Sequence, residues 1–439
     1  MSLFSILNYT KHLFSEKHLC NAPFSSIYIS GDGSITPCCF NRSYVYGNIY
    51  DTPLNEILKN SKFSEFKDLI KSHKFPIGCD ICKKHVQENN KSNSGIATYE
   101  NFPIQKNHLS VIEFELSYKC NLRCTMCRLN EAHLFVNDVR TNNIKFTIKE
   151  QIAQVVKNIK LMRFYGGEPF FIEEYYSIWE QTINIKPNCN FFVQTNGTIY
   201  NQRIESIIKK GNFNFNMSLD SVDKDIYESI RMGAHFENSF QNLFKFKQIA
   251  EFKGKTMSIS VCPMRINSKN IPDILEFCNK NNLFIFFNTV FSPWNMAIWS
   301  MSQNELTEIF NYYKSFKFSA NSKVKIINTQ RWKSFLNQVS NWIENAKRRP
   351  HLSENEIENA KNQIYCLIKN KTDNFLIQQN IIINFNQLKI KVTNSLDEIL
   401  KFVPVKTLIE KINNADAKTI YIKVIDKDEN AINENIIIP

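Results

Sequence analysis

The sequence predicts an α/β protein whose central part is a parallel β-sheet with a helix after each strand. Between residues 109 and 318, six short apolar runs alternate with stretches whose apolar residues recur at helical spacing. In addition, polar or cysteine-rich motifs follow the first four runs directly. A strand reaches a parallel neighbour through a right-handed crossover, usually a helix, and such sheets carry their chemistry at the carboxyl ends of the strands. Both observations favour six consecutive strand-helix units.

The elements follow one another in a regular order. Strands are expected at residues 111–116, 160–166, 190–197, 213–220, 256–263 and 283–290. Helices are expected at Ile148–Lys157, Ile172–Thr182, Gln202–Lys210, Ser239–Phe252 and Ile271–Asn281. The motifs CNLRCTMC, GGEP, TNG and SLDS come directly after the first four strands. We therefore expect these motifs to meet at one edge of the sheet.

The regions on either side of this sheet differ in composition. Residues 1–108 hold five cysteines in a turn-rich setting and end near the polar run VQENNKSNSG, which is typical of a loop or linker. Residues 319–439 begin with helical patterns and end with strand-like segments around NIIINFNQLKIKV and TIYIKVIDK, which flank a helical SLDEILKFV. The sequence thus predicts three domains, 1–108, 109–318 and 319–439, the last a small α+β accessory domain without a chemical motif.

Composition narrows the class of protein. The 439 residues are 43% hydrophobic, enough for two or three cores. The first twenty residues lack the features of a signal peptide, and no run approaches the roughly 18 apolar residues of a membrane span, so a cytoplasmic location is expected. There thiols stay reduced, and the twelve cysteines are expected to be metal ligands, catalysts or core residues. The net charge of +12 comes mostly from scattered Lys, which disfavours nucleic acid as the substrate.

Three cysteines, Cys120, Cys124 and Cys127, are crowded into nine residues after the first strand. A tetrahedral zinc site needs four donors, whereas a [4Fe-4S] cluster held by three thiolates keeps one iron open for a small molecule. The nearest further donor is His133, six residues on, and a lone His at that distance is more often structural. The absence of a fourth cysteine therefore favours an iron-sulfur cluster with one open iron.

A C-x-x-x-C-x-x-C loop after the first strand of such a sheet resembles the radical SAM superfamily over residues 109 to about 300. The resemblance implies a partial (β/α)6 TIM-like barrel and a [4Fe-4S] cluster whose open iron chelates the amino and carboxylate groups of S-adenosylmethionine. It also implies reductive cleavage of that cofactor to a 5'-deoxyadenosyl radical, which abstracts hydrogen from a substrate. A flavodoxin or ferredoxin-type protein would donate the electron.

The resemblance assigns the GGEP residues to the methionyl part of the cofactor. Gly166 and Gly167 would let the backbone approach it, and Glu168, followed by Pro169, would accept from its ammonium group. Gly166-Gly167 could instead be an ordinary turn. Arg231 sits where related enzymes pair a guanidinium with the methionyl carboxylate, although a surface helix charge is the plain alternative.

Further cofactor contacts are implied after the later strands. Thr195 and Asn196 would make a polar contact, and Ser218 and Asp220 would hydrogen-bond the ribose. Asn267 after the fifth strand is a weaker candidate. Large residues at the strand ends are candidates for either the pocket wall or the core: Phe164, Tyr165, Phe287 and Trp294.

The amino-terminal cysteines form a second group. A C-x-x-C on a turn is a common half-site for zinc, so Cys79 and Cys82 with Cys20 and Cys38 could hold a structural zinc ion. The pattern also resembles the auxiliary-cluster domains called SPASM or twitch, here placed before the barrel. That resemblance implies that these four cysteines ligate one auxiliary [4Fe-4S] cluster, with Cys39 as the alternative to Cys38. Four thiolates would saturate this cluster and give it a role in electron transfer.

The remaining cysteines, Cys189, Cys262, Cys278 and Cys366, are expected in the core by default. Cys262 is the exception, because it lies near the end of the fifth strand, where a thiol could return a hydrogen atom to a substrate radical. It is therefore a candidate catalytic residue.

The leading functional hypothesis is a radical SAM enzyme that modifies a peptide by oxidation, cross-linking or epimerisation. One alternative is a radical SAM dehydrogenase or epimerase of a sugar or small metabolite. Another, from a different class, is a non-catalytic iron-sulfur or zinc-binding interaction protein, although GGEP and Arg231 would then have no evident use. An RNA-modifying enzyme is favoured by charge alone.

Overall fold

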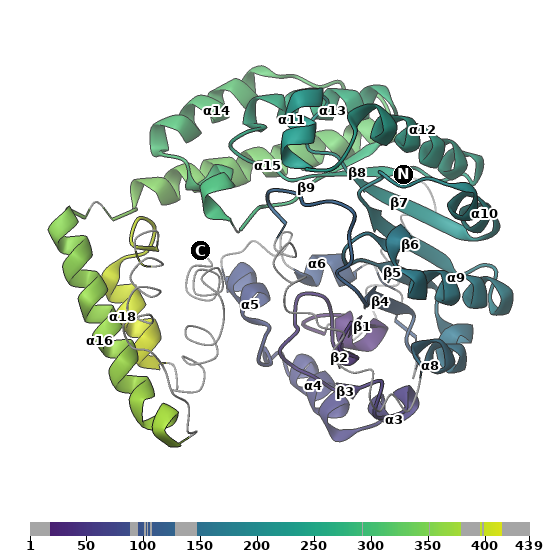
Figure 1. The fold of residues 1–439 in the computed structure, drawn as a ribbon, viewed down its shortest axis with the longest axis horizontal. Coiled ribbons are helices and arrows are strands. Elements are labelled where there is room, and N and C mark those ends of the chain that lie inside the picture. The colour runs from purple at the N-terminus through teal and green to yellow at the C-terminus, as the bar shows by residue number, and fades with distance from the viewer. Residues whose placement is uncertain are drawn as a thin grey trace. The chain divides into compact units, whose positions relative to one another are not determined.

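The computed structural model describes residues 18–87, 95–100, 102, 104–105, 108–127, 147–291, 293–350, 352–378, 396 and 399–414 (Figure 1). The chain divides into two compact units. Unit 1 comprises Met1–Ser218 and Arg231–Ile259, and unit 2 comprises Leu219–Ile230 and Ser260–Pro439. The domain boundaries predicted from the sequence, at residues 108 and 318, do not coincide with the limits of these two units. The division into three domains remains a prediction.

Unit 1 is built on a mixed sheet whose strand order is β3-β2-β1-β4-β5-β6-β7. Strand β2 pairs antiparallel with both β1 and β3. The pairs β1–β4, β4–β5, β5–β6 and β6–β7 are parallel. The start of β8 lies next to β7, where the Ser258 hydroxyl donates to the Phe215 carbonyl at 3.2 Å. The strands are β1 (Ser26–Ser30), β2 (Ser34–Thr36), β3 (Gly47–Asn48), β4 (Val111–Glu115), β5 (Leu161–Phe164), β6 (Asn190–Thr195), β7 (Asn212–Ser218) and β8 (Ser258–Val261). The predicted parallel α/β sheet is thus confirmed.

The joint between β1 and β4 is the unexpected part of this sheet. Ser26–Ser30 pairs in parallel with Val111–Glu115 over five residue pairs. The cysteine-rich segment therefore shares a sheet with the barrel strands. Its own helices are α2 (Ala22–Ser25), α3 (Leu54–Ile57), α4 (Ser61–Lys71), α5 (Asp80–Gln87) and α6 (Gly95–Glu100).

The helical face of the sheet carries the aromatic core of unit 1. Phe114 and Phe164 stack with their ring centroids 5.0 Å apart, and Phe164 also packs against Trp179 of α9 (Glu173–Ile185) at 5.3 Å. All three side chains are buried. Phe164 is therefore a core residue and not part of a pocket wall. The other helices on the chain path are α8 (Ile148–Val155), α10 (Gln202–Lys210) and α12 (Phe236–Phe252).

Capping residues define where these helices begin. Thr147 and Glu150 form a reciprocal capping box at the start of α8, which satisfies two backbone donors of the first turn. Asn201 accepts from the Ile204 amide at the start of α10, where the predicted and observed bounds agree. Helix α12 begins three residues earlier than predicted. The sequence did not predict α11 (Lys224–Ile230), which belongs to unit 2.

Unit 2 continues with the end of β8, which lies next to β9 (Phe284–Phe287), and with α13 (Ile271–Lys280). Phe287 stacks on Phe335 of α15 (Lys323–Lys347) at 4.7 Å, and Trp294 packs against Phe402, so both serve the core. The remaining long helices are α14 (Gln303–Ser315), α16 (Glu354–Gln378) and α18 (Val405–Asn414). The predicted carboxyl-terminal strands lie outside the described residues.

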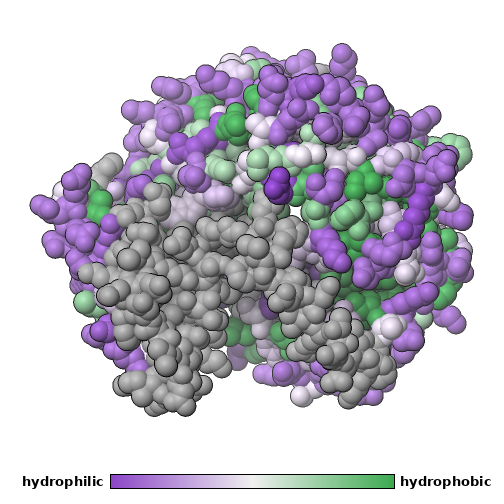
Figure 2. Space-filling view, viewed as in Figure 1, coloured by the Kyte–Doolittle hydropathy of each residue, from purple (hydrophilic) through white to green (hydrophobic). Residues whose placement is uncertain are grey.

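The surface gives no sign of a membrane-spanning element in the described part of the chain, where no helix combines the length and apolarity needed to cross a bilayer. The coloured surface in Figure 2 is largely hydrophilic, with hydrophobic residues scattered among polar ones. The predicted cytoplasmic location remains a prediction.

Candidate functional site

The three-cysteine loop follows β4 and is bound by the backbone that follows β5. The Gly167 amide donates to the Ser117 carbonyl at 3.1 Å, and the Glu168 amide donates to the Lys119 carbonyl at 2.9 Å. A Cβ on Gly166 would collide with the Ser117 carbonyl, and one on Gly167 would collide with the Lys119 carbonyl. The two glycines therefore permit close contact with the segment that precedes Cys120, a reason that the sequence had not indicated.

Glu168 joins the GGEP turn to the loop after β6. Its side chain is fully buried, and its carboxylate accepts from the Thr195 hydroxyl at 2.7 Å and from the Asn196 amide at 2.6 Å. It also accepts from the Phe170 amide at 3.2 Å. Burial raises the pKa of Glu168 to about 7, while these donors and the Arg231 charge oppose the rise. Glu168 and Thr195 thus position each other, whatever they bind.

Asn196 connects the same loop to the cysteines. Its side-chain amide donates to the Asn121 side-chain oxygen at 3.0 Å and lies 3.7 Å from the Cys120 sulfur. Asn121 in turn donates to the Thr198 hydroxyl at 2.8 Å. Asn121 and Thr198 were not singled out from the sequence, although Asn121 lies inside the cysteine motif. The motifs after β4, β5 and β6 therefore do meet at one edge of the sheet.

Arg231 approaches the loop from its other side. Its guanidinium lies 3.8 Å from the Cys124 sulfur, and the side chain is buried. The Arg123 amide donates to the Met232 carbonyl at 3.0 Å, which fixes the loop against the chain that follows α11. A buried guanidinium beside a thiol excludes the surface-charge alternative for Arg231. Pairing with a methionyl carboxylate remains a prediction.

The other predicted contacts have structural partners. Ser218 accepts from the Gln194 side chain at 3.1 Å in unit 1. In unit 2, the Asp220 carboxylate accepts from the Cys262 amide at 2.7 Å, and the Asn267 side chain donates to the Asp220 carbonyl at 2.8 Å and to the Cys262 carbonyl at 3.0 Å. Asp220 and Asn267 therefore fix the turn that carries Cys262, which is partly exposed. Ribose binding and hydrogen transfer remain predictions.

Four amino-terminal cysteines line one cavity in unit 1. They are Cys20, Cys38, Cys79 and Cys82, and Cys39 is not among the lining residues. Burial raises the pKa of Cys38 well above its usual value and that of Cys79 to about 11. Across the described residues, no three His, Cys, Asp or Glu side chains converge closely enough to hold a single metal ion. The donor set fits a group with four thiolate ligands.

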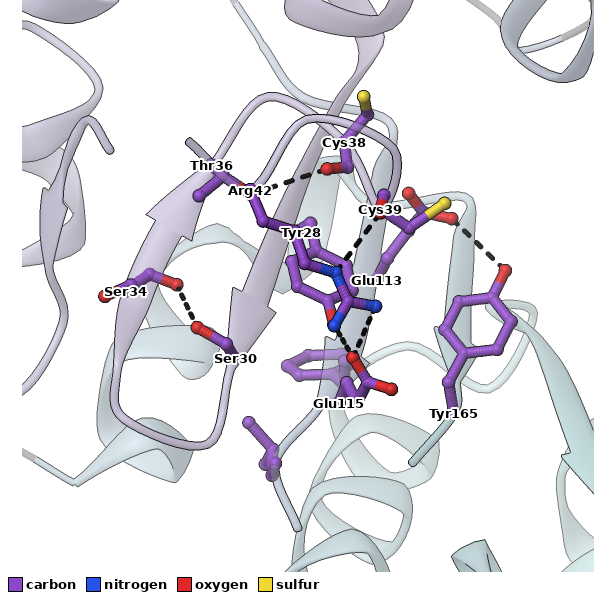
Figure 3. Close-up of polar contacts among 12 residues, drawn as sticks. Tyr28, Ser30, Ser34, Thr36, Cys38, Cys39, Arg42, Glu113, Glu115 and Tyr165 are labelled. Atoms are coloured by element: carbon purple, nitrogen blue, oxygen red, sulfur yellow. Dashed lines mark hydrogen bonds and ion pairs between the residues drawn. The ribbon is translucent and has the colours of Figure 1, made fainter. Parts of the chain in front are cut away.

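Cys39 points elsewhere than Cys38, as the two sulfur atoms in Figure 3 show. Its sulfur lies 3.5 Å from the Tyr99 hydroxyl, which in turn bonds Glu113 of β4. Glu113 is fully buried and also accepts from Arg163 at 2.9 Å and from Tyr165 at 3.2 Å. Burial and the nearby Glu113 raise the pKa of Cys39 to about 12. Cys39 and Tyr165 therefore belong to a buried polar network that the sequence did not reveal.

A second buried group of the same strand joins the cysteine segment to β4. Arg42 forms an ion pair with Glu115 at 2.6 Å, and Tyr28 of β1 also bonds Glu115 (Figure 3). The Arg42 guanidinium lies over the Tyr28 ring at 4.9 Å. Glu115 directly precedes the segment that leads to Cys120, so this group connects the two cysteine regions.

The fold and the two cysteine groups define an α/β protein with a three-cysteine loop at the carboxyl edge of its parallel strands. A model of the radical SAM superfamily matches residues 114–278, and a model of an iron-sulfur cluster-binding domain, SPASM, matches residues 20–84. The chain therefore contains a radical SAM domain, which is typical of a superfamily of enzymes, and an auxiliary iron-sulfur domain before it. The two matches imply a [4Fe-4S] cluster that binds S-adenosylmethionine and an auxiliary cluster.

Curated relatives match part of the chain. A GTP 3',8-cyclase from Clostridium botulinum is 26% identical over 185 residues, which are 41% of this chain and 56% of the relative. A probable GTP 3',8-cyclase from Methanocaldococcus jannaschii is 26% identical over 174 residues, 38% of this chain and 54% of the relative. The chain thus spans about half the length of these relatives.

Solved structures match part of the chain at low sequence identity. Native anSMEcpe with bound AdoMet is 16% identical with a TM-score of 0.35, and the alignment covers 47% of this chain and 59% of that one. Streptococcus suis SuiB bound to precursor peptide SuiA is 14% identical with a TM-score of 0.34, over 57% and 61% of the two chains.

Proposed function

We propose that this protein uses S-adenosylmethionine to abstract a hydrogen atom from a peptide substrate. The observation that carries the proposal is the convergence of Cys120, Glu168, Asn196 and Arg231 at one edge of the sheet. Cys120, Cys124 and Cys127 would hold three irons of a [4Fe-4S] cluster. Such a cluster, when bound and reduced, supplies the electron that cleaves the cofactor to a 5'-deoxyadenosyl radical.

The residues around the loop would bind and orient the cofactor. The buried Arg231 guanidinium suits a carboxylate, because its planar fork donates two parallel hydrogen bonds. Glu168 suits an ammonium group, and its position is held by Thr195 and the Asn196 amide.

We propose further that Cys20, Cys38, Cys79 and Cys82 ligate the auxiliary cluster. The position of all four thiols around one cavity supports this assignment, because a [4Fe-4S] cluster takes four thiolate ligands. Cys39 lies in a different network, which favours Cys38 as the ligand. Four protein ligands leave the cluster no open iron, so its role would be to accept an electron from the substrate.

A peptide substrate is supported by the amino-terminal auxiliary domain, because relatives with such domains often modify ribosomally made peptides. A nucleotide is the second candidate, since the matched relatives are named for cyclisation of GTP. Incubation with a deuterated peptide or deuterated GTP separates these candidates, because only the true substrate transfers deuterium to 5'-deoxyadenosine. A flavodoxin or ferredoxin-type protein is the proposed electron donor.

The cofactor assignment is tested by anaerobic reconstitution followed by dithionite and S-adenosylmethionine. We expect about eight irons per chain, as two [4Fe-4S] clusters require, and release of 5'-deoxyadenosine. Cys124→Ala should lose about half of the iron and all nucleoside release. Cys366→Ala, at an exposed position on α16, is the matched control and should retain both. Full iron content and nucleoside release in Cys124→Ala would contradict the assignment.

The auxiliary ligands are tested by comparing two neighbouring cysteines. Cys38→Ala should lose about four irons, whereas Cys39→Ala should keep about eight. Loss of about four irons from Cys39→Ala but not from Cys38→Ala would make Cys39 the ligand instead of Cys38. If the wild-type protein contains zinc and only about four irons, the four cysteines bind zinc and not an auxiliary cluster.

A further inference from the structure

Asn41 presents a hydrogen-bond donor to the four-cysteine cavity. The residue lines the cavity and is 1% exposed. Its side-chain oxygen accepts from the Ser43 and Tyr44 amides at 3.2 and 3.1 Å, which fixes the orientation of the amide group. The side-chain nitrogen therefore donates, at 2.9 Å to the Ile77 carbonyl and at 3.2 Å to the Cys79 sulfur.

The chain next to Cys79 leaves room for this contact. Gly78 has a φ of +83°, and a Cβ at this position would collide with the Asn41 side-chain oxygen. Any other residue at position 78 would push the amide away from the sulfur. The donor to Cys79 is thus built into the cavity and does not depend on a mobile side chain.

Tyr46 is a second buried donor, and it packs against a residue that lines the cavity. Its side chain is 1% exposed and packs edge-on against Phe63 and Phe66, and Phe66 lines the cavity. Its hydroxyl has no hydrogen-bond partner among the described residues. Burial, followed by the nearby Cys38, Tyr44, Cys79 and Cys20, raises the pKa of Tyr46 well above its usual value. A buried hydroxyl without a partner is costly, so a group between these thiols is its natural acceptor.

We propose that Asn41 and Tyr46 donate hydrogen bonds to the sulfur atoms of the auxiliary cluster and hold its reduction potential high. The inference rests on the proposed function, in which this cluster accepts an electron. Donors to the sulfur atoms stabilise the reduced state, because its extra negative charge lies partly on sulfur. Both residues are therefore tuning residues that never touch the substrate.

The test is a redox titration of the auxiliary cluster in the full-length protein with both clusters loaded, followed by electron paramagnetic resonance. Saturating S-adenosylmethionine shifts the signal of the other cluster and separates the two. In Tyr46→Phe we expect the ratio of reduced to oxidised auxiliary cluster at a fixed potential to fall about tenfold, which is a shift of about 59 mV for one electron. Tyr44→Phe is the matched control, because that hydroxyl bonds Glu65 near the surface, and its potential should equal that of the wild type.

Asn41→Asp is the second variant. It keeps the oxygen that accepts from Ser43 and Tyr44 but replaces the donor to Cys79 by a negative charge, so the potential should fall further than in Tyr46→Phe. Equal potentials in wild type, Tyr46→Phe and Asn41→Asp would overturn the inference and leave the proposed function intact. Loss of the auxiliary irons from Tyr46→Phe alone would make Tyr46 structural and also overturn its tuning role. A wild-type protein with only about four irons would instead refute the auxiliary cluster itself.

Discussion

Glu168 illustrates how a single buried side chain organises the site. Its carboxylate receives three hydrogen bonds, from Phe170 next to it in the chain and from Thr195 and Asn196 after the next strand. The sequence predicted that these residues would meet, because they follow neighbouring parallel strands. It could not predict that they bond one another, because alternation along a strand says nothing about side-chain pairing across loops.

Glu115 leads to a prediction on stability and pH. Burial raises its pKa to about 7, and the opposing charge of Arg42 is weakened because that side chain is 52% exposed. The folded chain then binds the proton more tightly than the unfolded chain, so the free energy of unfolding should decrease as pH rises from about 4.5 to 7. The decrease contributed by Glu115 is at most about 3 kcal/mol.

Urea unfolding of the iron-free, full-length chain at pH 5, 6 and 7 measures this dependence. Glu115→Gln should reduce the slope, because the amide does not titrate, and the pKa of Glu168, also raised to about 7, accounts for part of the slope that is left. Glu180→Gln removes a carboxylate at an exposed position and should leave the slope as in the wild type. An unchanged slope in Glu115→Gln would show that the carboxylate does not carry the effect.

At the scale of elements, the strands and helices of the parallel sheet could be predicted from hydrophobic spacing. Helix α10 has its predicted bounds because Asn201 caps its start and apolar residues recur regularly. The prediction missed α11, a short helix of seven residues with few periodic positions. It also missed the pairing of β1 with β4, since a run such as SIYIS does not indicate which strand it joins.

The turn after β5 gives a prediction at this scale. Gly167→Ala should displace the loop that carries Cys120, because the added methyl group would meet the Lys119 carbonyl. We expect the variant to retain about four of about eight irons and to release no 5'-deoxyadenosine. Iron analysis of the purified protein and product chromatography check this.

Gly254→Ala is the matched control for that variant. Gly254 also has a positive φ, of +68°, but no atom lies within 4 Å of the added carbon. It should therefore cost only about 1 kcal/mol of backbone strain and keep both clusters. Equal iron content in the two variants would show that the close contact at Gly167 does not support the loop.

At the scale of the whole molecule, the cysteine-rich segment and the barrel strands share one sheet through β1 and β4. In β1, four of the five paired residues are buried and the fifth is partly exposed. All five residues of β4 are buried. Without β1, the β4 strand would become an open sheet edge, which is prone to intermolecular pairing.

A protease site inserted at residues 89–92 tests this joint. After cleavage, the two fragments should remain together in size-exclusion chromatography under native conditions, because the β1–β4 pairing and the Arg42–Glu115 ion pair persist. A protein that lacks residues 1–108 should instead aggregate. Separate elution of the cleaved fragments would show that the joint contributes little to cohesion.

The position of the cysteines along the chain also sets a temporal order. Every residue that lines the four-cysteine cavity lies between Cys20 and Tyr99, whereas the loop at Cys120 takes contacts from residues as far along the chain as Asn196 and Met232. During translation, all residues of the four-cysteine cavity are therefore synthesised before the last partners of the Cys120 loop. The cavity residues are thus available to one another before the loop at Cys120 can acquire its full set of contacts.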